Sequence, residues 1–266
     1  LSGNHAQYGG GASGGTLNNC TLTGNSASNS GGGAHGGTLN NCTLTGNSAY
    51  QGGGAYHGTL TNCIVFYNTA PTDASYDGSS TLNYCCTTPL PGSGVGNLDL
   101  EPQLANARRL SANSPCLGKG SYASVSATDI DGEPWANPPA MGCDEYYSGS
   151  LTGALSVALL ASRTDVAAGF NVDLQALISG QVSASRWEFG DGTVVSNRAY
   201  ASYAWSAAGD YTVILRAYNE SYPGGVTATV TVHVAAQPVH YVAAGNPTPL
   251  PPYASWTTAA TNIQDA

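Results

Sequence analysis

Residues 31–52 read GGGAHGGTLNNCTLTGNSAYQG, and residues 9–30 read almost the same, GGGASGGTLNNCTLTGNSASNS. This near-identity decides the fold of the first third of the chain. A third, looser copy starts at Gly52. The last residue of each GGGA run and the cysteine that follows it advance together by 22 and then 21 residues, at Ala12, Ala34, Ala55, Cys20, Cys42 and Cys63. Self-similarity at a fixed period of this length indicates a stacked repeat architecture.

A period of 21 to 22 residues without helical hydrophobic spacing predicts a parallel β-helix with three short strands per coil. Leucine-rich repeats have a similar length but need a denser leucine pattern. Successive coils would rise by about 4.8 Å, the spacing between strands of a sheet. Equivalent residues then stack into ladders, and stacked asparagines stabilise such structures. The asparagines that close each Leu/Val-x-x-Asn motif form one expected ladder, Asn4, Asn25, Asn47 and Asn68.

The seven cysteines fall into two groups. Cys20, Cys42 and Cys63 form a second expected ladder, which Cys85 or Cys86 extends. We interpret these thiols as small apolar core residues rather than redox or metal ligands, because stacked, parallel Cβ vectors suit disulfide geometry poorly. Outside the ladder, Cys116 and Cys143 could form a disulfide, which would fit an oxidising compartment.

Composition excludes several classes of function. The chain has 266 residues, of which 41% are hydrophobic and only 9% charged, with a net charge of −9 and a single lysine, Lys119. No basic patch is available to neutralise phosphates, so nucleic-acid binding is not expected. No apolar run approaches a membrane span. Because the sequence has no initial methionine or signal peptide, we expect an internal fragment or a processed product.

Beyond residue 147 the pattern changes. Residues 148–153 are expected to be a linker, and residues 154–234 contain short alternating strands that predict a β-sandwich. Within them, Trp187-Glu-Phe-Gly-Asp-Gly192 is followed by Tyr203-Ala-Trp205. This segment resembles the PKD (polycystic-kidney-disease) domain, with Trp187, Phe189, Gly190, Asp191 and Gly192 as the signature. The resemblance implies an immunoglobulin-like fold that serves as a spacer or adhesion module.

The flanking regions carry two further resemblances. Residues 1–147 resemble bacterial β-helix proteins of the polymorphic outer-membrane and choice-of-anchor types. The resemblance rests on the GGGA and Leu/Val-x-x-Asn motifs and on the closing motifs near Cys116 and Cys143. This implies a right-handed parallel β-helix at a cell surface. Residues 235–266 resemble the N-terminal cap of another such β-helix. We therefore expect an extracellular structural or adhesive module, a filament subunit or tandem repeat, that contacts copies of itself head to tail through Leu1, Tyr241, Trp256 and Ile263.

Catalysis is not expected. Residues 1–72 contain no Asp, Glu, Lys or Arg, whereas glycoside chemistry needs paired carboxylates. The densest carboxylates, at 129–133 and 144–145, could hold calcium, but turn formation explains them better. No cofactor is therefore expected. An alternative function is a carbohydrate-binding module, in which an exposed row of aromatic rings would stack on sugars; the candidate rings are Tyr8, Tyr50, Tyr56 and Tyr67.

Overall fold

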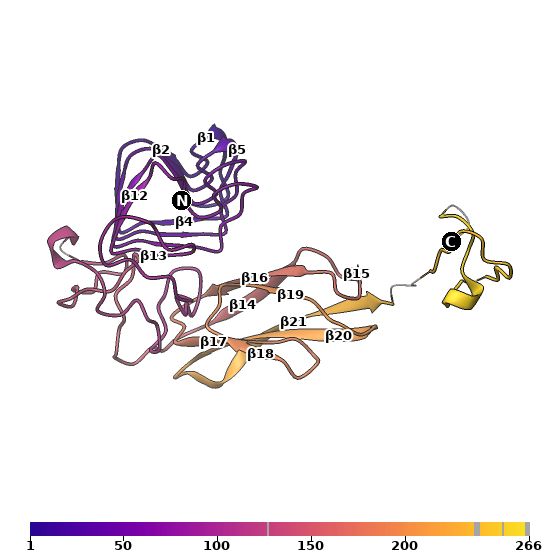
Figure 1. Cartoon of the computed structure of the whole chain (residues 1–266). Helices are drawn as coiled ribbons and strands as arrows, with labels where there is room; N and C mark the ends of the chain where they lie inside the picture. The colour runs from indigo at the N-terminus through magenta and orange to yellow at the C-terminus, as the bar shows by residue number, and fades with distance from the viewer. Residues whose placement is uncertain (127, 237–239, 252, 264–266) are drawn as a thin grey trace.

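The computed structural model describes residues 1–126, 128–236, 240–251 and 253–263. It consists of a parallel β-solenoid, an irregular closing segment, a β-sandwich and a small C-terminal unit (Figure 1). Among the described residues, helix is confined to two 3-10 turns, η1 (Tyr122–Ser124) and η2 (Trp256–Thr258). Neither approaches the length and hydropathy that a membrane-spanning helix requires. The predicted all-β fold, a β-solenoid followed by an immunoglobulin-like sandwich, is confirmed.

Four sheets run along the solenoid, and every strand pair in them is parallel. One sheet contains β3 (Thr16–Asn18), β7 (Thr38–Asn40), β10 (Thr59–Thr61) and β12 (Thr81–Asn83). A second contains β4 (Thr21–Thr23), β8 (Thr43–Thr45), β11 (Ile64–Phe66) and β13 (Cys86–Thr87). The other two are β2 (Ala12–Ser13), β6 (Ala34–His35) and β9 (Ala55–Tyr56), and β1 (His5–Tyr8) with β5 (Ser26–Ser30).

The prediction of three strands per coil was therefore wrong, because a complete coil has four strand segments. The additional corner lies in the GGGA run. Gly31, with φ of 70°, turns the chain between β5 and β6, a conformation that glycine adopts without strain. The next two glycines, Gly32 and Gly33, have no space for a side chain because the backbone of the adjacent coil is too close. A Cβ on Gly33 would lie 2.4 Å from the carbonyl oxygen of Gly54 in the adjacent coil.

Strict register gives the solenoid its core. Leu17, Leu39, Leu60 and Leu82 pair with one another from coil to coil. The inner leucines Leu39 and Leu60 are at most 1% exposed. They pack with the neighbouring alanines and cysteines in one continuous cluster. Equivalent residues thus fill equivalent space in each coil, as the repeat requires.

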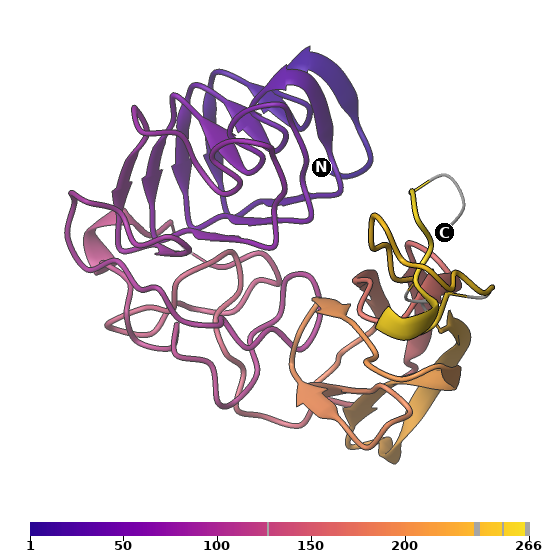
Figure 2. The same cartoon turned by 45° about the vertical axis from the view of Figure 1, so that its right-hand side comes forward.

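The closing segment, residues 88–147, covers the outer face of the sheet that contains β4, β8, β11 and β13 (Figure 2). Ile64 on β11 is fully buried against this segment, in a cluster with Leu104 and Met141. The segment also closes the C-terminal end of the solenoid. Leu98 bridges to Cys86, and the Asn97 side chain accepts a hydrogen bond from the Cys85 N–H at 2.9 Å.

Two packed sheets form the sandwich. One contains β14 (Ser156–Ala161), β16 (Val172–Ser179) and β19 (Tyr200–Tyr203). The other contains β15 (Asp165–Ala167), β17 (Ala184–Glu188), β18 (Val194–Ser196), β20 (Gly209–Asn219) and β21 (Tyr222–Ala235). Inward residues of both sheets surround Trp187, Phe189 and Trp205, each at most 1% exposed. Burial alternates along β20, as the period of a strand requires.

Residues 148–153, expected to be a linker, are held against the sandwich. The carbonyl oxygen of Leu151 accepts a hydrogen bond from the Glu220 N–H at 2.9 Å, and Leu151 is 7% exposed. The closing segment contributes as well, because Ala105 is fully buried against Val182 and Ala217 of the sandwich. Apolar contacts therefore join the solenoid region to the sandwich.

The C-terminal unit lies apart from the sandwich in Figure 1. Val242 and Ala260 form a parallel bridge, which makes the chain between them one coil-like turn. Ala259 and Ala260 are fully buried inside it, and the rings of Tyr241 and Trp256 meet edge to face with centroids 4.8 Å apart. The predicted cap of residues 235–266 also includes 237–239, 252 and 264–266, which lie outside the described residues.

Candidate functional site

The asparagines predicted to form a ladder lie in one column inside the solenoid. The backbone N–H and the side-chain amide of Asn25 both donate to Oδ1 of Asn47, at 3.0 Å each. The same pair of bonds joins Asn4 to Asn25 and Asn47 to Asn68. Asn25 and Asn47 are at most 1% exposed. Because the carboxamides of Asn25 and Asn47 use all their donors and acceptors in hydrogen bonds to neighbouring coils, these two residues stabilise the stack.

A second asparagine column was not predicted. Asn19, Asn41 and Asn62 each precede a cysteine of the repeat. All three adopt the left-handed conformation, with φ of 50°, 49° and 54°. Their side-chain amides donate to carbonyl oxygens of the closing segment, those of Thr128, Ser124 and Ser121. The sequence signal for this column was the Asn-Cys pair that recurs once per coil. The hydrogen bonds of the column connect the closing segment to successive coils.

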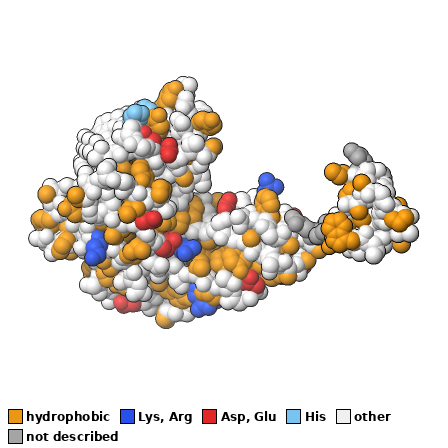
Figure 3. Space-filling view, viewed as in Figure 1, with side chains coloured by type: hydrophobic (Ala, Val, Ile, Leu, Met, Phe, Trp, Pro, Cys, Tyr) orange, Lys and Arg blue, Asp and Glu red, His pale blue; other side chains and the backbone are white. Residues whose placement is uncertain are grey.

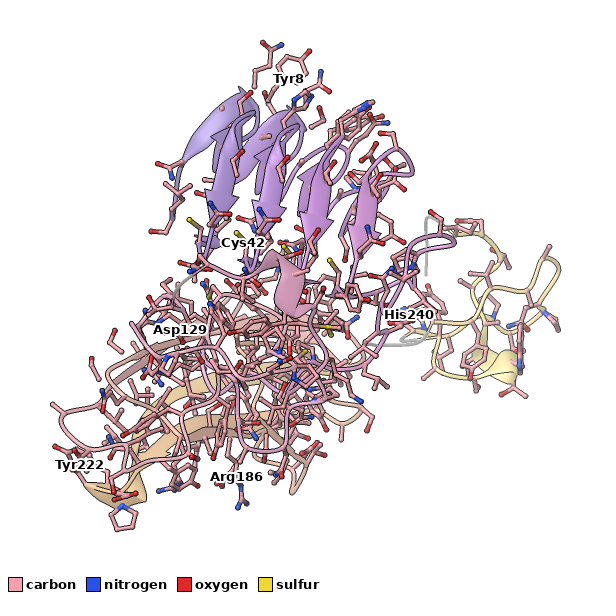
Figure 4. All side chains as sticks on the ribbon, turned by 90° about the vertical axis from the view of Figure 1, so that its left-hand side faces the viewer. Tyr8, Cys42, Asp129, Arg186, Tyr222 and His240 are labelled. Atoms are coloured by element: carbon pink, nitrogen blue, oxygen red, sulfur yellow. The ribbon has the colours of Figure 1, made fainter. Side chains whose placement is uncertain are left out.

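The ladder cysteines belong to the core of the solenoid, with Cys20 partly buried at its edge. Figure 4 labels one of them, Cys42, beside the strands. The thiol of Cys63 donates to the Thr61 carbonyl at 3.3 Å, and the other three ladder thiols bond the equivalent carbonyl. Burial raises the pKa of Cys63 well above its usual range. A neutral, buried thiol is a poor nucleophile and metal ligand. Of the two candidates for extending the ladder, Cys85 does so, whereas Cys86 faces the closing segment.

The disulfide between Cys116 and Cys143 is not formed in the structure, where both are free thiols. Cys116 instead lies beside Cys86, and its pKa is raised first by their hydrogen bond and then by burial. The N–H of Cys143 donates to the Thr43 hydroxyl of β8 at 3.1 Å, and burial raises the pKa of the Cys143 thiol to about 12. The two cysteines therefore pack against different strands of the solenoid, which separates their side chains.

The acidic residues considered for calcium organise turns instead. Asp129 accepts hydrogen bonds from three backbone N–H groups, those of Asp131, Glu133 and Glu145. Glu145 likewise accepts from three backbone N–H groups. Asp131 forms ion pairs with Arg108, at 2.9 Å, and with Arg109. Across the described part of the chain no cluster of three or more His, Cys, Asp or Glu side chains could hold a metal ion.

A row of rings follows the exposed wall formed by β2, β6 and β9. Tyr8 and Tyr56 each lie 5.4 Å from the ring of His35, and Tyr56 lies 4.5 Å from the ring of His57. The Ser79 hydroxyl lies between His57 and Asp77. A Ser-His-Asp triad needs the histidine between the other two, so this arrangement does not activate a nucleophile.

This row differs from the one considered for sugar binding. It contains Tyr8 and Tyr56 but neither Tyr50, which is 61% exposed elsewhere on the solenoid, nor Tyr67, whose hydroxyl donates to Glu101. His35 and Tyr56 stack at 17°, so these rings cover each other's faces. Since a sugar needs an open ring face, the wall is better suited to supporting the coils than to binding a glycan.

The aromatic signature of the sandwich forms one hydrogen-bonded turn. Asp191 accepts from the Thr193 N–H at 2.9 Å and from the Tyr203 hydroxyl at 2.6 Å. Phe189 stacks on Tyr203 with centroids 4.0 Å apart, and the indole of Trp187 donates to the carbonyl of Arg198 at 2.9 Å. Gly190 and Gly192 have φ of 83° and 94°, which glycine permits. All five signature residues have structural roles.

The residues predicted at an assembly interface lie at the two ends of the chain. Leu1 is 54% exposed, Trp256 68% and Ile263 80%, whereas Tyr241 is partly covered by Trp256. The structure brings Tyr241 and Trp256 together and leaves Leu1 on the first coil. Figure 3 shows apolar side chains on the surface of the C-terminal unit.

Comparison with known families bears on the sandwich. Residues 156–234 match the family model of the PKD domain, and this range coincides with strands β14 to β21. A search of curated proteins found no match to the chain. The chain therefore contains a PKD domain preceded by a parallel β-solenoid. PKD domains occur in extracellular proteins, and this combination fits an extracellular structural or adhesive module.

Proposed function

We propose that the chain is a non-enzymatic repeating unit of an extracellular filament or long surface protein, in which the C-terminal unit of one copy caps the first coil of the next. The observation that carries the proposal is the contrast between the two ends of the solenoid. The closing segment covers the last coil, whereas among the described residues only 1–3 lie on the open edge of the first coil, where they pair with β4. The following copy can be a separate subunit or a later part of the same polypeptide.

The first coil has the features of an interface. Strands β1, β2 and β3 pair with the second coil only, whereas β4 also pairs with residues 1–3 through the bridge between Ser2 and Thr23. The other edges of β1, β2 and β3 therefore present free backbone groups, which favour association with further strands. Core residues are also less covered here. Leu17 is partly buried, whereas its equivalent in the next coil, Leu39, is 1% exposed. Another coil placed on this end would complete both the sheets and the core.

The C-terminal unit has the complementary features. The parallel bridge between Val242 and Ala260 has the same strand direction as a rung of the solenoid. It exposes several large apolar side chains, with Leu250 61% exposed in addition to Trp256 and Ile263. Since the two surfaces are different and lie at opposite ends of the chain, the contact is heterologous and repeats without closing.

Absence of catalysis is part of the proposal. Three observations support it. Asp129 and Glu145 accept hydrogen bonds from turn N–H groups. Ser79 lies between the histidine and the aspartate, whereas a catalytic triad has the histidine in the middle. Among the ladder cysteines, the thiol of Cys63 is fully buried and burial raises its pKa, which makes it a poor nucleophile.

Trp256 provides a direct test. The other three tryptophans, Trp135, Trp187 and Trp205, are at most 7% exposed, so quenching of the fluorescence by acrylamide reports mainly on Trp256. With rising concentration of the whole chain, we expect quenching to fall as linear assemblies become visible by electron microscopy. The variant Ile263→Ser should require at least about tenfold more protein to assemble, because it removes an interfacial apolar contact.

Leu90→Ser is the matched control, since Leu90 is 53% exposed but belongs to neither end; it should assemble like the parent chain. Truncation after Ala235 should abolish assembly while preserving the circular dichroism of the solenoid and sandwich. Unchanged assembly after this truncation would show that the capping contact does not exist.

A further inference from the structure

We infer that the angle between the solenoid and the PKD domain holds a binding site for a neutral oligosaccharide. The solenoid and the sandwich diverge from their junction, and the outer face of the sheet of β14, β16 and β19 faces the solenoid (Figures 1 and 3). A cleft of ≈ 560 Å³ lies there, within the range typical of small-ligand sites, which occur often where two domains meet.

Two cross-strand rows of side chains form the floor of the cleft on the sandwich. In the first, Leu160 is paired with Gln175 and Gln175 with Tyr200. In the second, Asp173 is paired with Ser202. Because the rows are two residues apart along β16, they point to the same face and lie about 6.6 to 7 Å apart. A ligand longer than one sugar ring would contact both.

The opposite wall comes from the solenoid, at Gly46 and residues 67–69. Tyr200 fixes the relation between the walls. Its ring lies over Gly46, where an added Cβ would meet the phenol oxygen at 2.1 Å, and its centroid is 5.6 Å from that of Tyr67. Arg198 adds an ion pair to Glu101 of the closing segment at 3.4 Å. The cleft is thus built by a defined junction that is present before any ligand binds.

The chemistry of the lining favours a glycan. Of its residues only Asp173 and Arg198 are charged, and their charges are opposite, so neither a phosphate nor a polyanion finds a cationic cluster. The amide of Gln175 donates to the Tyr200 hydroxyl at 3.1 Å, which leaves its carbonyl oxygen to accept from a ligand. Carboxylate, amide and hydroxyl groups match the donors and acceptors of sugar hydroxyls, while Tyr200 and Leu160 offer apolar contact to the ring C–H groups.

This site is independent of the proposed assembly, and its test can use the full chain with Ile263→Ser at concentrations where it is monomeric. Cellohexaose, laminarihexaose and mannohexaose are titrated by NMR and calorimetry, up to about 10 mM so that even a millimolar Kd registers. We expect at least one to bind. Asp173→Ala and Gln175→Ala should each weaken binding about three- to tenfold by removing a hydrogen bond, and Ser202→Trp should abolish it by filling the cleft.

Asp99→Ala, at an exposed carboxylate outside the cleft, and Tyr8→Ala, in the ring row of the solenoid, are the matched controls and should bind like the parent. Two results would overturn the inference: binding by none of the three hexasaccharides, or binding that Tyr8→Ala weakens and Ser202→Trp does not. Because Ser202 is exposed, its replacement should leave the thermal transition unchanged, which verifies that the variant is folded.

Discussion

At the scale of single residues, most polar side chains inside the solenoid are fully paired. Asn47 shows why this matters. Its Oδ1 accepts two hydrogen bonds from Asn25, and its amide donates to Asn68 and to the Leu22 carbonyl. A buried polar group that loses its partner costs more than the bond itself contributed. The column therefore stabilises one register of the coils and penalises others.

Replacement of Asn47 tests this role. Asn47→Ala should lower the free energy of unfolding by about 2 to 4 kcal/mol, because several buried groups lose their partners together. Asn18→Ala, in an exposed asparagine pair, should cost less than about 1 kcal/mol. Urea denaturation gives both values. Equal losses for the two variants would mean that the buried column contributes nothing special.

Asp144 predicts a pH dependence of stability. Burial, opposed by Arg109, raises the pKa of Asp144 from 3.8 to about 7, so the folded state binds its proton more tightly than the unfolded state. Its contribution to stability is full below about pH 4 and is lost as the pH rises through 7. Asp144→Asn should flatten the fall in unfolding free energy between pH 4 and 7, whereas Asp99→Asn should not. A parent chain without any such fall would refute this assignment.

At the scale of elements, the coils depend on close backbone approach at the GGGA runs. Gly33 has no space for a side chain, since a Cβ would meet the Gly54 carbonyl of the next coil. Gly33→Ala should therefore separate two coils locally and cost about 3 kcal/mol or more of stability. Gly78→Ala, where nothing lies within 4 Å of the added Cβ, should be nearly neutral. Thermal unfolding of both variants checks this, and a neutral Gly33→Ala would show that the coils can yield.

At the scale of the whole molecule, the solenoid and PKD domain are held together by a small junction. Ala105, fully buried against Val182 and Ala217, is its apolar centre. A carboxylate there would lack a partner, so Ala105→Asp should release the sandwich. We expect a larger maximum dimension by small-angle X-ray scattering and faster proteolysis at residues 148–153. The exposed Ala112 provides the control, Ala112→Asp, and unchanged scattering for Ala105→Asp would contradict a docked arrangement.

The sequence by itself determined the period of the solenoid, the columns of Asn25, Asn47 and Cys42, and the PKD turn around Asp191. Each of these features depends on a short-range sequence pattern. A repeat stacks equivalent residues of successive coils on one another, and the conformation of a turn is set by residues adjacent in the sequence. Only the tertiary structure decided that Cys116 lies beside Cys86, that residues 148–153 are hydrogen-bonded to the sandwich, and that a cleft forms beside Tyr200. These features bring together segments that are far apart in the chain. No repeat or local motif in the sequence indicates which of those segments come into contact.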